Sequence, residues 1–196
     1  MCPGGFVVNA SSEENHLVIN GMSNHDRNEE NSNSAIVVQV SNKDFGSNIF
    51  DGMNFQRTLE EKAYNICNGL IPVQLFSDYE NNIISKKFKS IKPVFKGNYG
   101  FANINNIFPE FINKDLKEAI NYFNNKIDGF NSGDAIIAGV ETRTSSPIRI
   151  LRDEKGISNI EGIYPIGEGA GYSGGITTSA MDGIKISELI AKVYKN

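Results

Sequence analysis

The sequence has few cysteines, no long hydrophobic run and no basic cluster, and each absence excludes some classes of function. Cys2 and Cys67 are the two cysteines of the 196 residues, and they have neither metal-binding nor redox spacing, so we predict no metal site. No apolar stretch approaches the ~18–20 residues that cross a bilayer. The first residues lack the basic start and apolar segment of a secretory signal. Together these features predict a protein of the reducing cytoplasm.

The charge and the composition indicate a globular protein. There are 23 acidic and 19 basic residues, a formal net charge of -4, which argues against broad nucleic-acid binding. Apolar residues make up 39% of the chain and charged residues 21%, enough for a real core. The length suits one domain, or a small domain with part of another.

The first forty residues predict strands. Runs of β-branched residues separated by polar turns favour strands over residues 5–11, 16–21 and 34–40. Between the last two, the polar stretch MSNHDRNEENSNS (22–34) has no periodicity and is typical of a solvated loop.

The middle of the chain predicts two helices around an irregular segment. Apolar spacing in FQRTLEEKAYNICNG predicts a helix over 55–69 that stops at Gly69, with Cys67 as a small core residue. Residues 70–104 mix short apolar runs with prolines and glycines, and we expect irregular structure there. A second helix is predicted over 113–130. Its N-terminal residue is Asn113 or Asp115, and its inward residues are Leu116, Ile120, Phe123 and Ile127.

The C-terminal third predicts two strands and a helix. Strands are expected over 134–141 and 160–166, and an amphipathic helix over 175–195. The apolar residues at helical spacing are Ile176, Ala180, Ile184, Leu189 and Val193. Gly183 lies inside this helix, and a glycine in that position usually marks the close approach of another backbone.

Residues 169–174 spell G-x-G-x-x-G between the second strand and the last helix. A fingerprint that opens a dinucleotide-binding domain is followed by a further strand and an acidic residue about 20 residues on. The residues after Gly174 supply neither, and no Gly-Lys-Ser/Thr of a P-loop follows. Two interpretations stay open: a tight turn with no ligand, or a turn whose backbone and helix start face a ligand.

Seven blocks, in order, resemble the C-terminal part of bacterial FAD-dependent, or NAD(FAD)-utilising, dehydrogenases. They are CPGG, NGMSNHDRNEENSNSA, NSNSAIVVQV, GMNFQRTLEEKA, PVQLFSDY, VETRTSSPIRILRD and YPIGEGAGYSGGITTSAMDGIKISE. They cover nearly the whole chain. Members of that family carry several hundred further residues before the first block, including the N-terminal G-x-G-x-x-G.

The resemblance implies an α/β fold in two parts. Residues 1–140 would be a mixed α+β inserted domain on the substrate side. Residues 141–196 would be the C-terminal strand–turn–helix part of a Rossmann-like FAD-binding domain whose N-terminal half is absent. The glycines would then close a dinucleotide-binding domain rather than open one.

The resemblance also implies site residues. Backbone N–H groups at the end of the glycine segment would face the flavin, where negative charge accumulates on reduction. The implied FAD-binding residues are Gly167, Glu168, Gly169, Ala170, Gly171, Gly174, Gly175 and Ile176.

The catalytic candidates are less specific. Arg143 is a candidate to contact flavin or a substrate carboxylate, and a surface or ion-paired arginine is as good an interpretation. His25 and Arg27 are candidates for a proton donor and an anion clamp, against an exposed loop histidine. Cys2 beside a flavin would be a redox candidate, but it has no CxxC partner.

Two functions follow from different classes. The first is the C-terminal part of an FAD-dependent oxidoreductase that transfers hydride or electrons to a small-molecule substrate. The second is a fragment without catalysis that serves as a folding or interaction module and needs an upstream partner chain. NAD(P) belongs to the family's name, and no residue of this chain supports a site for it.

Overall fold

The computed structural model describes residues 3–194, which divide into two compact units. Unit 1 comprises Met1–Val40 and Gln56–Thr142, and unit 2 comprises Ser41–Phe55 and Arg143–Asn196. Helices and strands both occur, so the predicted mixed α/β class is confirmed. No helix within 3–194 is long and apolar enough to cross a membrane.

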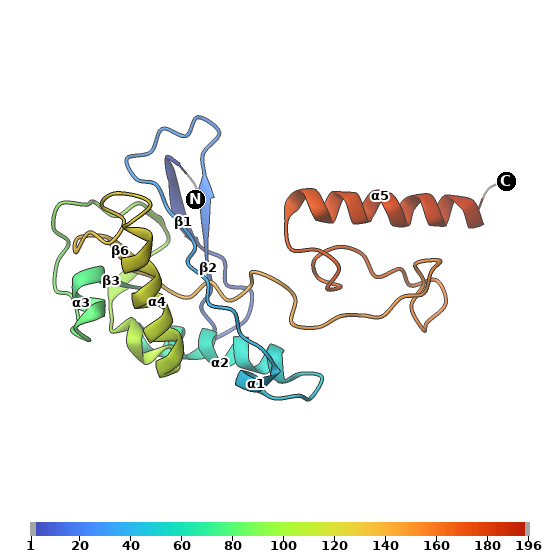
Figure 1. Ribbon diagram of the computed structural model, residues 1–196, viewed down its shortest axis with the longest axis horizontal. Coiled ribbons are helices and arrows are strands. Elements are labelled where there is room, and N and C mark those ends of the chain that lie inside the picture. Colours follow the sequence, from blue (N-terminus) through green and yellow to red (C-terminus); the bar gives the residue numbers. More distant parts are fainter. Residues whose placement is uncertain (1–2, 195–196) are drawn as a thin grey trace. The chain divides into compact units, whose positions relative to one another are not determined.

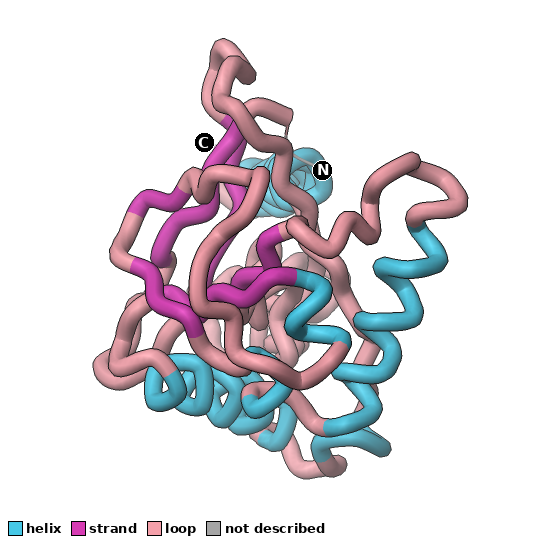
Figure 2. Tube along the Cα trace, turned by 90° about the vertical axis from the view of Figure 1, so that its left-hand side faces the viewer, coloured by secondary structure: helices cyan, strands magenta, loops and turns pink. Residues whose placement is uncertain are grey.

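Unit 1 holds the strands. In one sheet β1 (Gly5–Asn9) is the middle strand, with β2 (Ile19–Ser23) antiparallel to it and β4 (Phe95–Lys96) parallel. In the other, β3 (Ile71–Leu75) is the middle strand, with β5 (Tyr99–Phe101) parallel and β6 (Ile136–Ala138) antiparallel. Figure 2 shows these strands as short segments joined by long loops. The strands predicted near residues 5–11, 16–21 and 134–141 are therefore confirmed.

The prediction of irregular structure over 70–104 is wrong at its start, because β3 is a strand at the centre of the core. All five residues of its sequence IPVQL are buried. A continuous apolar run of this length suits a strand covered on both faces. Pro72 misled the prediction, since prolines are rare in middle strands. Its carbonyl nevertheless accepts a hydrogen bond from the N–H of Gly139.

Helix α2 (Asp51–Ile66) confirms the first predicted helix. Leu59, Ala63 and Cys67 are buried along one side. The N–H of Gly69 donates to the carbonyl of Tyr64, and Gly69 has a φ of 79°, the left-handed conformation that ends helices. Burial raises the pKa of the Cys67 thiol, as expected for a core residue.

Helix α4 (Glu110–Phe123) begins three residues earlier than predicted, and it also ends earlier. Pro109 is its N-cap residue, and Asn113 lies inside the helix instead of capping it. The Asn113 side chain is buried, where it accepts a hydrogen bond from the Tyr79 hydroxyl and donates to the carbonyls of Asn105 and Phe108. Ile127 lies beyond the helix and is 46% exposed, so its inward assignment is wrong.

Buried polar side chains fasten the segments that follow β3, where α3 (Phe76–Glu80) and the 3₁₀ turn η1 (Ile104–Asn106) lie. The Gln74 amide donates to the carbonyl of Ile83 and accepts from the N–H of Ile104. The Ser85 hydroxyl accepts from the N–H of Leu75 and donates to Asp78. Each link satisfies a polar group that burial would otherwise leave unpaired.

The strand predicted over 34–40 does not form. Its exposure still alternates from residue 36 to residue 40, and Val37 is 65% exposed. Residues 34–40 pair with no strand within residues 3–194. β-branched residues favour a strand only where a neighbouring strand gives them something to pack against.

Unit 2 is mostly coil, and it contains α1 (Asn42–Phe45), the first residues of α2, and α5 (Ile176–Val193). Ser41 and Asp44 form a capping box at α1. Helix α5 confirms the last predicted helix and runs along the coil that precedes it (Figure 1).

One expectation for unit 2 is wrong, and the apolar residues at helical spacing in α5 do not form its buried side. Residues 160–166 form a turn and then irregular coil rather than a strand, with Ile160, Ile163 and Ile166 exposed. Along α5 the fully buried residue is Ile186, whereas Ile176 and Ile184 are 94% and 62% exposed. In both places the apolar pattern is present, but the rest of unit 2 supplies no surface to cover it.

Candidate functional site

The candidate site is the glycine turn, residues 167–175, which leads into α5. The N–H of Gly171 donates to the carbonyl of Glu168, and the N–H of Tyr172 donates to that of Gly167. Gly167 and Gly171 have φ values of 73° and 81°, where a side chain would be strained. These residues make the loop turn back on itself.

In one part of the turn, close packing within the chain explains why the residues are small. A Cβ on Gly171 would lie 2.6 Å from the carbonyl oxygen of Ile148. Arg149 keeps the two segments close, because its Nε and Nη2 donate hydrogen bonds to the Gly171 carbonyl, at 3.0 and 2.8 Å. Ala170 is buried, and its carbonyl accepts from the N–H of Ile150. Residues 170–171 therefore pack against the chain itself.

Other glycines in the turn have no such reason. A Cβ on Gly169 or on Gly174 would meet no atom within 4 Å, and a Cβ on Gly175 would meet only the Thr178 hydroxyl at 3.7 Å. None of the three has a left-handed φ, and that of Gly175 is -177°, ordinary extended backbone. Neither backbone strain nor packing within unit 2 requires glycine here. The open space leaves bare backbone accessible to a ligand.

The start of α5 offers hydrogen-bond donors. No side chain caps the helix at Gly175. The Thr178 hydroxyl donates to the Gly175 carbonyl, and the Ser173 and Ser179 hydroxyls lie 2.7 Å apart. The first N–H groups of a helix have no acceptor within it, and they lie at the positive end of its dipole. An anionic or electron-rich group suits this position.

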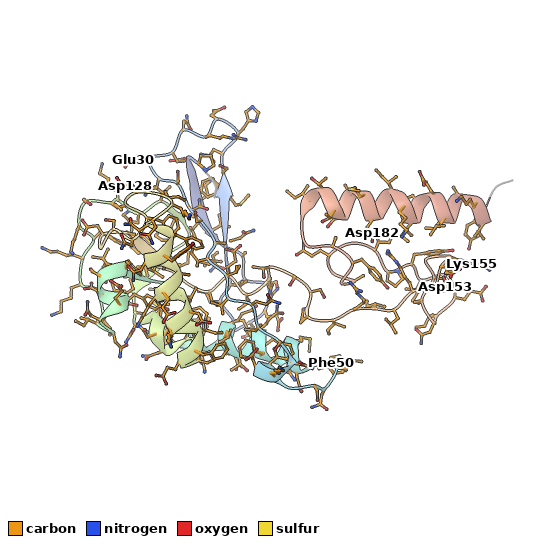
Figure 3. The ribbon with its side chains drawn as sticks, in the orientation of Figure 1. Glu30, Phe50, Asp128, Asp153, Lys155 and Asp182 are labelled. Atoms are coloured by element: carbon orange, nitrogen blue, oxygen red, sulfur yellow. The ribbon has the colours of Figure 1, made fainter. Side chains whose placement is uncertain are left out.

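An ion pair fixes the turn to α5. Arg152 donates through Nη1 and Nη2 to the two carboxylate oxygens of Asp182, at 2.9 and 2.6 Å. The N–H of Gly167 donates to the same carboxylate at 2.9 Å. Arg152 also donates to the Pro165 carbonyl and lies 3.6 Å over the Tyr172 ring. Figure 3 shows Asp182 on the side of α5 that faces the coil.

The side chains of this ion pair are buried. The Arg152 and Asp182 side chains are 8% and 10% exposed. Hydrogen bonds from the Arg152 guanidinium and from the Gly167 N–H lower the pKa of Asp182 to about 2, although burial opposes the shift. The same contact raises the pKa of Arg152. The carboxylate therefore stays charged and anchors the first residue of the turn.

Sequence reasoning missed this anchor, although a signal was present. Asp182 lies four residues before Ile186 and so shares its buried side of α5. A carboxylate on a buried face needs a cation, and Arg152 in the preceding block has the required charge.

The structure places the catalytic candidates of unit 1 in an exposed loop. His25 and Arg27 are both exposed. Asparagines hold the loop in place: Asn33 donates to the Met22 carbonyl, and Asn31 to the Lys92 carbonyl. The loop is thus attached to its neighbours, while the proton-donor and anion-clamp roles stay predictions. Cys2 lies outside the described residues.

Arg143 begins the second segment of unit 2, directly after the end of unit 1. Just before it, burial raises the pKa of the Glu141 carboxyl. The Thr142 hydroxyl donates to the buried carboxylate of Glu60 at 2.5 Å. The two residues before Arg143 are thus partly shielded from water. The contact of Arg143 with flavin or substrate stays a prediction.

Comparisons with known proteins agree with the resemblance. Residues 1–144 match the family described as FAD-dependent protein, C-terminal domain-like. A protein of Clostridium beijerinckii named only as uncharacterized is 46% identical over 198 residues, covering 99% of this chain and 37% of the relative. The chain thus spans little more than a third of that relative's length. On the match over 1–144, the chain belongs to the family of FAD-dependent proteins with this C-terminal domain.

Proposed function

We propose that the chain is the C-terminal part of a cytoplasmic FAD-dependent oxidoreductase and that its glycine turn contacts the cofactor. Family membership supports the association with FAD. The observation that carries the placement is the open space at Gly169 and Gly174, where nothing within unit 2 explains the absence of a side chain. A ligand that approaches the backbone closely explains it.

The residues of the turn fit one part of such a cofactor. Gly174, Gly175 and Ile176 would direct the N–H groups of the α5 start toward an electron-rich edge, and the bare backbone of Gly169 would lie beside a chain or phosphate. Gly167 and Glu168 would set the path of the turn, fixed by Asp182. FAD, when bound, supplies hydride or electron transfer to a small-molecule substrate. The protein supplies position and fixed dipoles.

The two-part architecture belongs to this proposal. Residues 1–140 would form the inserted, substrate-side domain, and 141–196 the last segment of the FAD-binding domain. Arg143, His25 and Arg27 would be the residues that meet the substrate. The NAD(P) of the family's name has no support in this chain.

The alternative function is an interaction module that holds no cofactor by itself. The observation that favours it is the high exposure of apolar side chains in unit 2, such as Leu151 at 75% and Ile160 at 58%. Surface of this kind usually belongs to a partner. The partner would be an upstream polypeptide that supplies the adenosine half of the FAD site.

Titration with FAD distinguishes the two functions. We expect the full chain alone to bind FAD weakly or not at all. It should bind tightly when mixed with the part of the Clostridium beijerinckii relative that lies outside the matched segment. Gly174→Val should abolish this binding, because its side chain fills the open space. Glu161→Val, which adds the same side chain at an exposed position of the same coil, should leave it unchanged. No binding in the mixture would refute the flavoprotein function and leave the interaction module.

A further inference from the structure

Helix α5 has three faces of different character. The first packs on its own unit: Ile186 and Leu189 lie over Gly156, where an added Cβ would be 2.8 and 3.5 Å from their terminal methyl groups. The second is charged and exposed, and its residues are Lys185, Glu188 and Lys192. These two faces are those of an ordinary surface helix.

The third face is uncharged, and we call it the docking face. Most of its residues follow one another at intervals of three and four, the spacing that places side chains on one side of a helix, and Gly183 lies next to Ile184 on that side. The residues of the docking face are Ile176, Ala180, Gly183, Ile184, Ser187 and Ala191. Ile176 and Ile184 are 94% and 62% exposed, and the two alanines are exposed as well. The Ser187 hydroxyl donates to the Gly183 carbonyl within the helix, so its hydrogen is already used.

Gly183 gives an independent indication that another backbone approaches this face. A Cβ added there would meet no atom within 4 Å, and its φ lies outside the left-handed range. Glycine inside a helix is less stable than alanine, and nothing within unit 2 compensates for it. Small residues at 180, 183, 187 and 191 let a neighbouring element come closer than larger side chains would permit.

Unit 2 also lacks a core of its own. Among its described residues, the buried apolar side chains are Pro165, Ala170 and Ile186. A unit this small needs most of its apolar surface covered to fold stably. The docking face is therefore surface that has to be covered from outside unit 2.

The relative indicates which polypeptide covers it. The match covers 99% of this chain but 37% of the Clostridium beijerinckii protein, and the family match is to a C-terminal domain. We propose that the docking face of α5 packs against the remaining part of such a flavoprotein, in the same chain or as a separate one. This inference rests on the proposed function, because it identifies that remaining part as the FAD-binding portion.

The test mixes the full chain with that remaining part of the Clostridium beijerinckii relative, expressed separately, in buffer without FAD. Association is measured by calorimetry. Ile184→Glu and Ala180→Glu should each weaken it by about tenfold or more, because they place a charge in a dry, close-packed contact. Ile127→Glu makes the matched change at an isoleucine of unit 1 that is 46% exposed, and should change the affinity by less than about twofold.

The outcomes separate this inference from the flavoprotein function. Equal affinities for the wild type and both α5 variants would overturn the docking face, even if FAD binds to the mixture. Association that depends on the docking face, in a mixture that takes up no FAD, would support the face and refute the cofactor. If the chain alone forms dimers in sedimentation, and Ile184→Glu abolishes them, a second copy is the occupant and the proposal is wrong. Circular dichroism confirms that the variants, all changed at exposed positions, remain folded.

Discussion

The same residue types are buried in unit 1 and exposed in unit 2. In unit 1, Phe76 and Ile71 are completely buried. In unit 2, Phe50 and Ile163 are 55% and 48% exposed. Unit 1 encloses β3 between neighbouring strands and helices, whereas unit 2 arranges α5 and a coil around a few contacts and one ion pair. Apolar pattern alone therefore does not make a core; the surface that covers it has to be present.

The largest effect is expected from truncating a phenylalanine in each unit. Phe76→Ala should lower the free energy of unfolding by about 3–5 kcal/mol, because it removes a fully buried ring and leaves a cavity. Phe50→Ala should cost less than about 0.5 kcal/mol, as for most surface substitutions. Urea unfolding of the two variants measures both. Similar losses would show that the units are equally well packed in solution and would remove the comparison.

A smaller effect is expected from removing one arginine in each unit. Arg152→Leu should cost unit 2 about 3 kcal/mol, because it leaves the Asp182 carboxylate buried without its cation. Arg57→Leu removes a pair with Glu13 whose side chains are 47% and 37% exposed, and should cost about 0–1 kcal/mol. Thermal unfolding compares the two changes, and amide exchange at Gly167 reports whether the turn is released. A turn that exchanges as slowly in Arg152→Leu as in the wild type would show that the ion pair does not hold it.

Acid should weaken unit 2 through the same carboxylate. Because the pKa of Asp182 falls from 3.8 to about 2 on folding, its contribution is complete above pH 4 and is lost as the pH falls to about 2. The linked stability is about 2 kcal/mol. Hydrogen bonds from Ser90 and Lys89 also lower the pKa of Asp134 in unit 1, so the stability of the whole chain would not isolate the effect of Asp182. Amide exchange at Gly167 is therefore the readout, because this N–H donates to Asp182 itself. Asp182→Asn should remove this pH dependence, and a variant that keeps it would place the titrating group elsewhere.

The same difference explains how much the sequence could predict. Helical spacing located α2 and α5 because their patterns are long, and the β-branched runs located β1 and β6. The strands predicted over 34–40 and 160–166 failed because a strand needs a partner, which no local pattern reveals. The middle strand β3 was missed because Pro72 outweighed the apolar run around it. In the candidate site, the glycine turn was evident from its sequence, but the anchor between Arg152 and Asp182 joins residues thirty positions apart.

The smallest effect tests the comparison at a single atom. Gly183→Ala adds a methyl group to α5 where nothing lies within 4 Å, and alanine favours a helix by roughly 0.8–1.0 kcal/mol over glycine. We therefore expect this change to stabilise the chain studied alone by up to about 1 kcal/mol, measured by thermal unfolding. It should also weaken association with the remaining part of the relative, because the methyl group holds the two backbones apart. Gly133→Ala is the matched change in unit 1, where the new Cβ would lie 3.2 Å from the side chain of Ser77, and it should leave the association unchanged. Gly183→Ala is thus expected to raise the stability of the isolated chain and to lower the affinity of the association. A glycine that lowers the stability of the isolated chain is explained by a contact that the isolated chain does not make. If Gly183→Ala stabilises the chain and the association is as tight as before, the glycine serves no contact on that face.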